Sequence, residues 1–130
     1  MLVIAIVIIN ASTAPEGIPS YVKKVTAYKE GDGLIVYFIL ADESGQMIAS
    51  SGQAHLKITG EYGTALYEIT LPMGISDFHK TEVGMGAFKH DAVICSFGRL
   101  PISYSSGMGK VTVDFTHGGQ TLSGSETVFF

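Results

Sequence analysis

Alternation of apolar and polar residues with a period of two is the feature that most constrains this chain. It is clearest in residues 53–59, 64–71 and 110–116. Successive side chains of a β-strand point to opposite faces of a sheet, so each of these segments predicts a half-buried strand. No stretch keeps a period of 3.6, so the sequence favours a fold with almost no helix.

Turn residues divide the chain into short segments. Asp32-Gly33 precedes the wholly apolar run 34–41, which we expect to be the central strand of the core, and His117–Gln120 predicts a closing hairpin. The expected strands are 21–29, 34–41, 47–50, 53–59, 64–71, 87–97, 110–116 and 121–130. About seven to nine strands at this spacing, plus an apolar N-terminal strand, predict an all-β, two-sheet antiparallel β-sandwich.

Three local expectations accompany this architecture. Residues 72–86 read as irregular, with one helical turn over 76–80 capped by Ser76. The segment 21–29 reads as an edge strand whose lysines discourage pairing with another chain, and its alternation places Val22 and Val25 on opposite faces. The residues Gly98–Pro101 are expected to interrupt the strand before them.

Composition excludes several classes of protein. The 130 residues suit one domain, 46% hydrophobic content argues against disorder, and one cysteine cannot form a disulfide framework. A net charge of −4, with no basic run longer than Lys23-Lys24, argues against nucleic-acid binding. Charged residues make up only 15%, against about 25% in an average soluble domain. We therefore expect this chain to bury surface against something beyond its own domain.

The N-terminal segment 1–10 is the most apolar part of the chain. Three interpretations compete: a buried or donated β-strand, a remnant of a secretory signal, and the end of a membrane anchor. No Lys or Arg precedes the run, and as a helix it spans only about 13 Å of the ~30 Å hydrocarbon core. Its many branched residues favour a strand. The expected assembly residues are Leu2, Val3, Ile4, Ile6, Val7, Ile8 and Ile9.

Residues 11–20 are expected to be a flexible connector, and residues 21–130 the sandwich domain. The connector contains two prolines and is long enough to reach a neighbouring copy. Asn10-Ala11-Ser12 forms an acceptor triplet for glycosylation at Asn10, which matters only in an exported chain.

The order of segments in residues 34–58, together with the closing hairpin 110–130, resembles the immunoglobulin-like and fibronectin-type-III-like modules of cell-surface proteins. The resemblance covers about residues 21–130 and is one of fold. The chain departs from antibody domains because Cys95 is alone and Trp is absent. Such modules imply adhesion, assembly or binding.

Chemistry-bearing residues form no catalytic or metal-binding pattern in the sequence. The four histidines are spread over four segments, and Cys95 lies in an apolar strand, where a free thiol behaves as a small hydrophobe. We expect no enzyme activity, cofactor or metal. Exposed aromatic residues offer a weaker signal for carbohydrate binding, and the candidates are Tyr21, Tyr28, Tyr62 and Tyr104.

Two functions follow from these expectations. The first is an extracellular or cell-surface structural or adhesive subunit, which self-associates into a homo-oligomer or filament by donating the strand 2–9. The alternative is an extracytoplasmic module that binds a carbohydrate or a surface protein, with residues 1–9 as the end of a membrane anchor. Upstream sequence with further apolar residues would favour the alternative.

Overall fold

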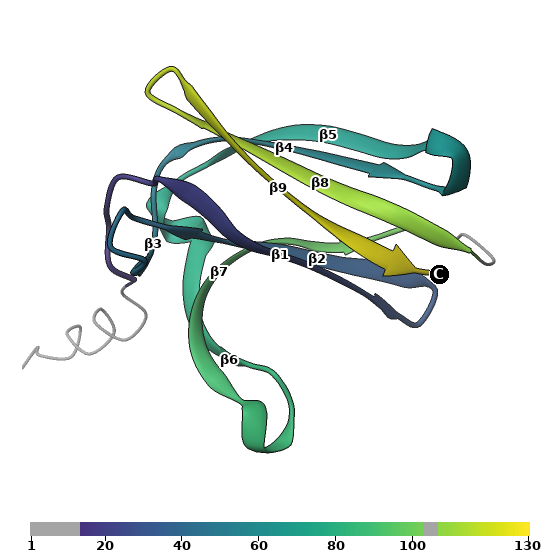
Figure 1. The fold of residues 1–130 in the computed structure, drawn as a ribbon, viewed down its shortest axis with the longest axis horizontal. Helices are drawn as coiled ribbons and strands as arrows, with labels where there is room; N and C mark the ends of the chain where they lie inside the picture. Colours follow the sequence, from purple (N-terminus) through teal and green to yellow (C-terminus); the bar gives the residue numbers. More distant parts are fainter. Residues whose placement is uncertain (1–13, 103–106) are drawn as a thin grey trace, which may run out of the picture.

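The computed structural model describes residues 14–102 and 107–130, and in this part of the chain two antiparallel sheets pack face to face (Figure 1). The assembly residues 2–9 and the acceptor Asn10 lie outside the described residues. The first sheet contains β1 (Tyr21–Glu30), β2 (Gly33–Ala41), β3 (Met47–Ile48), β6 (Phe78–Val83) and β7 (His90–Leu100). The second contains β4 (Gly52–Thr59), β5 (Ala65–Met73), β8 (Met108–His117) and β9 (Gln120–Phe129).

The sheet order confirms the predicted all-β, two-sheet sandwich. The first sheet runs β1-β2-β7-β6, with β3 paired to the end of β2, and the second runs β5-β4-β8-β9. The apolar strand β2 lies between β1 and β7, as its continuous hydrophobicity predicts.

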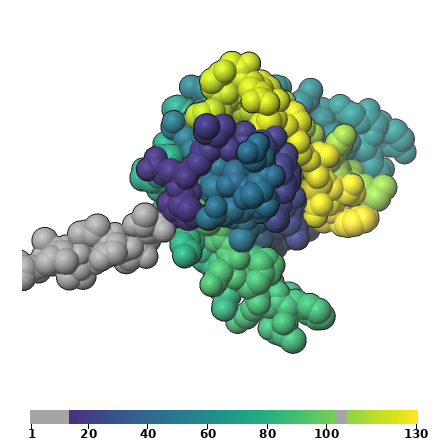
Figure 2. Space-filling model, turned by 60° about the vertical axis from the view of Figure 1, so that its left-hand side comes forward, coloured from purple at the N-terminus to yellow at the C-terminus, as the bar shows by residue number. Residues whose placement is uncertain are grey.

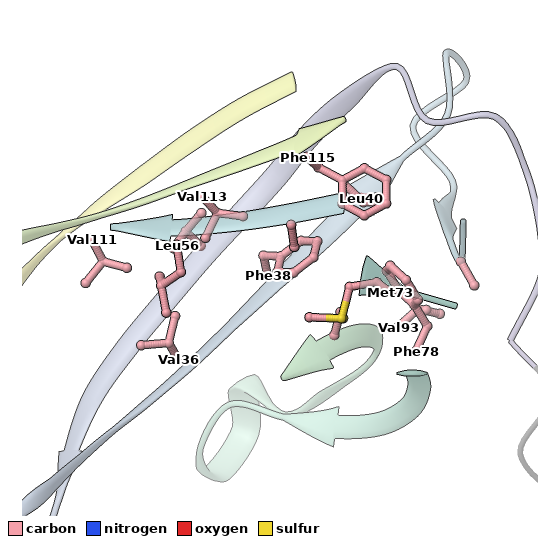
Figure 3. Close-up of a cluster of buried hydrophobic side chains, with 14 of the residues drawn as sticks. Val36, Phe38, Leu40, Leu56, Met73, Phe78, Val93, Val111, Val113 and Phe115 are labelled. Atoms are coloured by element: carbon pink, nitrogen blue, oxygen red, sulfur yellow. The ribbon is translucent and has the colours of Figure 1, made fainter. Parts of the chain in front are cut away.

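Alternation places one face of β4 and one face of β8 in the core. Leu56 on β4 lies opposite Val113 on β8, and both side chains are fully buried. Three aromatic rings join the sheets: Phe38 from β2, Phe78 from β6 and Phe115 from β8 have ring centroids 5.9–6.3 Å apart (Figure 3). Aromatic pairs at this spacing add stability beyond the area they bury.

The edge strand β1 departs from simple alternation. Val22 pairs with Leu40 and Lys24 with Ile39, so Lys23 is an extra residue that forms a β-bulge. The bulge turns Val22 and Val25 to the same, inward face, and the prediction that they lie on opposite faces is wrong. Lys23 donates a hydrogen bond to the Gly45 carbonyl at 3.2 Å.

The segment 72–86 is more regular than predicted. A short 3-10 turn covers Ile75–Asp77, and the Asp77 carboxylate, not Ser76, accepts a hydrogen bond at its start, from the Gly74 amide at 2.7 Å. Strand β6 then follows directly. Most of its side chains are exposed on both faces, so no alternation marks it in the sequence.

Strand β7 continues through the residues expected to interrupt it. Ile35 pairs with Arg99 and Tyr37 with Ser96, so β7 absorbs one extra residue as a bulge and runs on to Leu100.

The described part of the segment 11–20 lies against β3. The Ala49 amide donates to the Pro15 carbonyl at 2.7 Å, and the Gly17 amide donates to the Ala49 carbonyl at 3.1 Å. Ala14 is only 5% exposed and belongs to the core cluster. The chain is therefore held to its own domain from Ala14 onward.

Candidate binding site: the arm groove

Beyond the sandwich, β6 and β7 continue as a two-stranded ribbon that we call the arm (residues 79–94). Strand β7 pairs with β2 only from Cys95 to Leu100, because β3 takes the remaining place beside β2. His90–Ile94 therefore pair only with β6 among the described strands. Figure 2 shows the arm, in green, as a projection from the body of the molecule.

A groove of about 650 Å³ lies between the arm and the outer face of the first sheet. We call it the arm groove. Its lining residues are Lys24, Thr26 and Tyr28 of β1, Tyr37 and Ile39 of β2, and Glu82, Val83, Gly84, Met85 and His90 of the arm. Aromatic and aliphatic side chains with a few polar groups among them are the usual lining of a binding site.

The tip of the arm exposes large apolar side chains. Phe88 is 83% exposed and Met85 is 81% exposed. Gly84 makes the tight turn between them and β6: its φ is +98°, and a Cβ there would lie 2.5 Å from the Phe88 carbonyl oxygen. The tight turn therefore places two large apolar side chains in solvent, and neighbouring exposed apolar side chains are typical of an interaction surface.

Two residues on the groove floor have unusual environments. Ile39 points to the outer face, opposite Phe38 and Leu40, yet is only 3% exposed. The Thr26 hydroxyl is the one buried side-chain polar atom in the described part of the chain without a hydrogen-bond partner. An unsatisfied buried hydroxyl costs about 1–3 kcal/mol, and a bound backbone group would offset this cost.

A second hollow, of about 390 Å³, lies at the far end of the second sheet and involves Tyr62. We call it the loop-end pocket, and its lining residues are Gly60, Glu61, Tyr62, Met108, Gly109, Lys110 and Thr127. Tyr62 is 99% exposed and has φ +65°, a left-handed conformation that is rare for a tyrosine. The Glu61 carboxylate accepts a hydrogen bond from the Met108 amide at 3.3 Å.

The outer face of the second sheet is polar by contrast. Cross-strand neighbours there include His55, Asp114 and Ser123. His55 Nε2 lies 2.6 Å from the Glu68 carboxylate and His55 Nδ1 lies 3.7 Å from that of Asp114. All of these side chains are partly solvated, and exposed pairs of this kind contribute little to stability.

Within residues 14–102 and 107–130, no group of three or more His, Cys, Asp or Glu side chains is placed to hold a metal ion. Cys95 is fully buried in the core, as predicted. Burial, with a smaller contribution from the charge of Asp77, raises the pKa of its thiol to about 12. Such a thiol is a poor nucleophile.

The residues singled out in the sequence lie in different places. Tyr28 lines the arm groove and Tyr62 the loop-end pocket, while Tyr21, which is 43% exposed, lines neither. Tyr104 lies outside the described residues. Sequence reasoning placed a strand over 87–97, which includes the β7 half of the arm, but missed β6 and the projection of the two strands from the sandwich. The one available signal was Met85-Gly-Ala-Phe88, apolar side chains in a glycine turn, where a turn is normally polar.

No family model, curated protein or solved structure matches this chain. In the described ranges no helix is long and apolar enough to cross a membrane. The fold and site together define a two-sheet antiparallel β-sandwich with a projecting hairpin arm.

Proposed function

We propose that this protein is a non-enzymatic structural or adhesive subunit of the extracellular or cell-surface type, which self-associates through its arm. The observation that carries the proposal is the arm itself. A lone two-stranded ribbon is marginally stable in water, and this one exposes Phe88 and Met85 at its tip. Contact with another protein would bury both side chains and pair the open edge of β7.

The composition supports the same function. Only 15% of the residues are charged, and three exposed large apolar side chains, Met85, Phe88 and Tyr28, lie on the arm or in its groove. An interaction surface is the ordinary reason for such a patch.

The test compares the full chain with the double variant Met85→Lys/Phe88→Lys by light scattering and electron microscopy. We expect the unchanged chain to form oligomers or filaments, and the double variant to remain monomeric with the same circular dichroism spectrum. The matched control is Phe129→Lys, which removes another exposed aromatic side chain, 69% exposed, away from the arm. A monodisperse monomer of the unchanged chain would overturn the proposal.

A second candidate, a carbohydrate-binding module, is favoured by the loop-end pocket. Tyr62 offers an exposed aromatic face, and Glu61, Lys110 and Thr127 supply hydrogen-bonding groups beside it. The chain has no Trp and six tyrosines, so comparison with Tyr62→Ala isolates the contribution of this site to the tyrosine fluorescence. Titration with neutral oligosaccharides should change that fluorescence, and Tyr62→Ala should abolish the change if sugars bind here.

A further inference from the structure

We propose that the arm groove receives the apolar segment Leu2–Ile9 of a second copy of this chain, laid as an extended strand along the open edge of β7. This inference rests on the proposed function and names the donor and the acceptor of the contact.

The acceptor offers both backbone and side-chain contacts. Among the described strands, His90–Ile94 have a partner on one side only, and we infer that their other backbone edge can pair with a donated strand. His90 also lines the groove, whose floor and walls include Ile39, Tyr37 and Val83. Main-chain hydrogen bonds to an open edge provide affinity, and the adjacent pocket provides selectivity for apolar side chains.

The donor fits this acceptor in length and chemistry. Leu2–Ile9 contains no polar residue, so it is apolar on both faces when extended. Eight residues in a strand span about 26 Å, and the five residues of the open edge span about 17 Å, so the segment covers the edge fully. Lys24 and Glu82 are both exposed, so an apolar segment can dock in the groove while their charged ends stay in water.

The position of Ala14 limits how far the donor segment can extend from its own domain. Ala14 is packed in its own core, and Pro15 is bonded to Ala49. Only residues 10–13 separate Ala14 from Ile9, so these two residues lie at most about 18 Å apart. A donated segment therefore brings the donor's domain close to the arm, where it can cover Phe88 and Met85. A segment in the groove of its own chain would contact Met85, which lines the groove, but would bring no second domain to cover Phe88.

Disulfide capture tests the pairing. Full-length Ile6→Cys is mixed with full-length Glu82→Cys under mild oxidation, and cross-linked peptides are identified by mass spectrometry. Glu82 lines the groove and is exposed. The control acceptor is Ser125→Cys, exposed on the outer face of the second sheet. Buried Cys95 does not compete for oxidation.

We expect the Ile6–Glu82 cross-link to exceed the Ile6–Ser125 cross-link by about tenfold or more, because docking raises the effective concentration of the paired thiols. Closure of Ile6→Cys/Glu82→Cys within one dilute chain, without cross-linked dimers, would overturn the second-copy assignment. Equal cross-linking to both acceptors while particles still form would overturn the groove and leave self-association standing. Absence of particles from the unchanged chain would overturn both proposals.

Discussion

Phe38 is the residue on which the packing of the two sheets most depends. Its ring is fully buried and contacts Phe78 and Phe115, with centroids 6.0 and 5.9 Å away. Phe38→Ala leaves a cavity between the sheets and should lower the free energy of unfolding by about 3–5 kcal/mol in urea denaturation. Phe129→Ala, at an exposed position, should change it by less than about 0.5 kcal/mol. Similar losses in both variants would contradict this view of the core.

Cys95 gives the stability of the fold a pH dependence. Burial raises the pKa of its thiol from 9.0 to about 12, so above pH 9 the unfolded chain loses this proton while the folded chain keeps it. The unfolded state then binds fewer protons, and stability falls as pH rises from 9 toward 12. Comparing urea denaturation at pH 8 and 10.5, we expect Cys95→Ala to lose less stability than the unchanged chain. Equal losses would show that the thiol does not contribute.

Among the elements, β9 approaches β1 closely at Gly124. A Cβ at this position would lie 2.6 Å from Val22 Cγ1 and 3.1 Å from Val25 Cγ2. Replacing glycine in a strand ordinarily stabilises it, but here the clash should dominate, and Gly124→Val should cost about 1–3 kcal/mol. Val22→Ala combined with Gly124→Val should recover part of this loss in a double-mutant cycle. Additive losses would argue that the two strands do not touch here.

The arm should be the least stable element of the described chain. Within the described residues, His90–Ile94 pair with a strand on one side only, whereas β2 lies between two strands. Hydrogen exchange should therefore be fast in the arm and slow in β2, with opening free energies near zero and near the global value respectively. The measurement is made on the monomeric Met85→Lys/Phe88→Lys variant. Equally slow exchange in both elements would mean that the arm is held by contacts within its own domain.

At the scale of the whole molecule, the outer face of the first sheet is less polar than that of the second. This difference in polarity should determine how self-association responds to salt. The contact surface that we propose is apolar, so self-association should persist or strengthen as NaCl rises from about 0.05 to 0.5 M, where charge interactions are screened. Sedimentation velocity at both concentrations is the measurement. Dissociation at the higher concentration would indicate that charges, and not the arm, hold the copies together.

Whether a strand could be predicted from the sequence depended on how much of it is buried. Strands with one buried face, such as β4 and β8, were predicted correctly because the core imposes alternation on them. Strand β6 was missed because it is exposed on both faces and carries no such pattern. The bulge at Lys23 was missed because one extra residue changes the face of Val22 without changing the composition of the strand. Tyr28 was found as an exposed aromatic residue, but its partners in the groove come from distant segments.

The sequence by itself therefore determined the fold class, the central strand and the burial of Cys95, since each depends on local alternation or on a continuous apolar run. Only the tertiary structure decided that β3 displaces β7 from the end of β2, and so releases the arm. The physical reason is competition for one strand edge: Leu40 and Ala41 pair with either β3 or β7 but not with both. The outcome depends on pairing between segments far apart in the sequence, which local patterns do not specify. The arm that results forms one wall of the groove that we propose as the binding site.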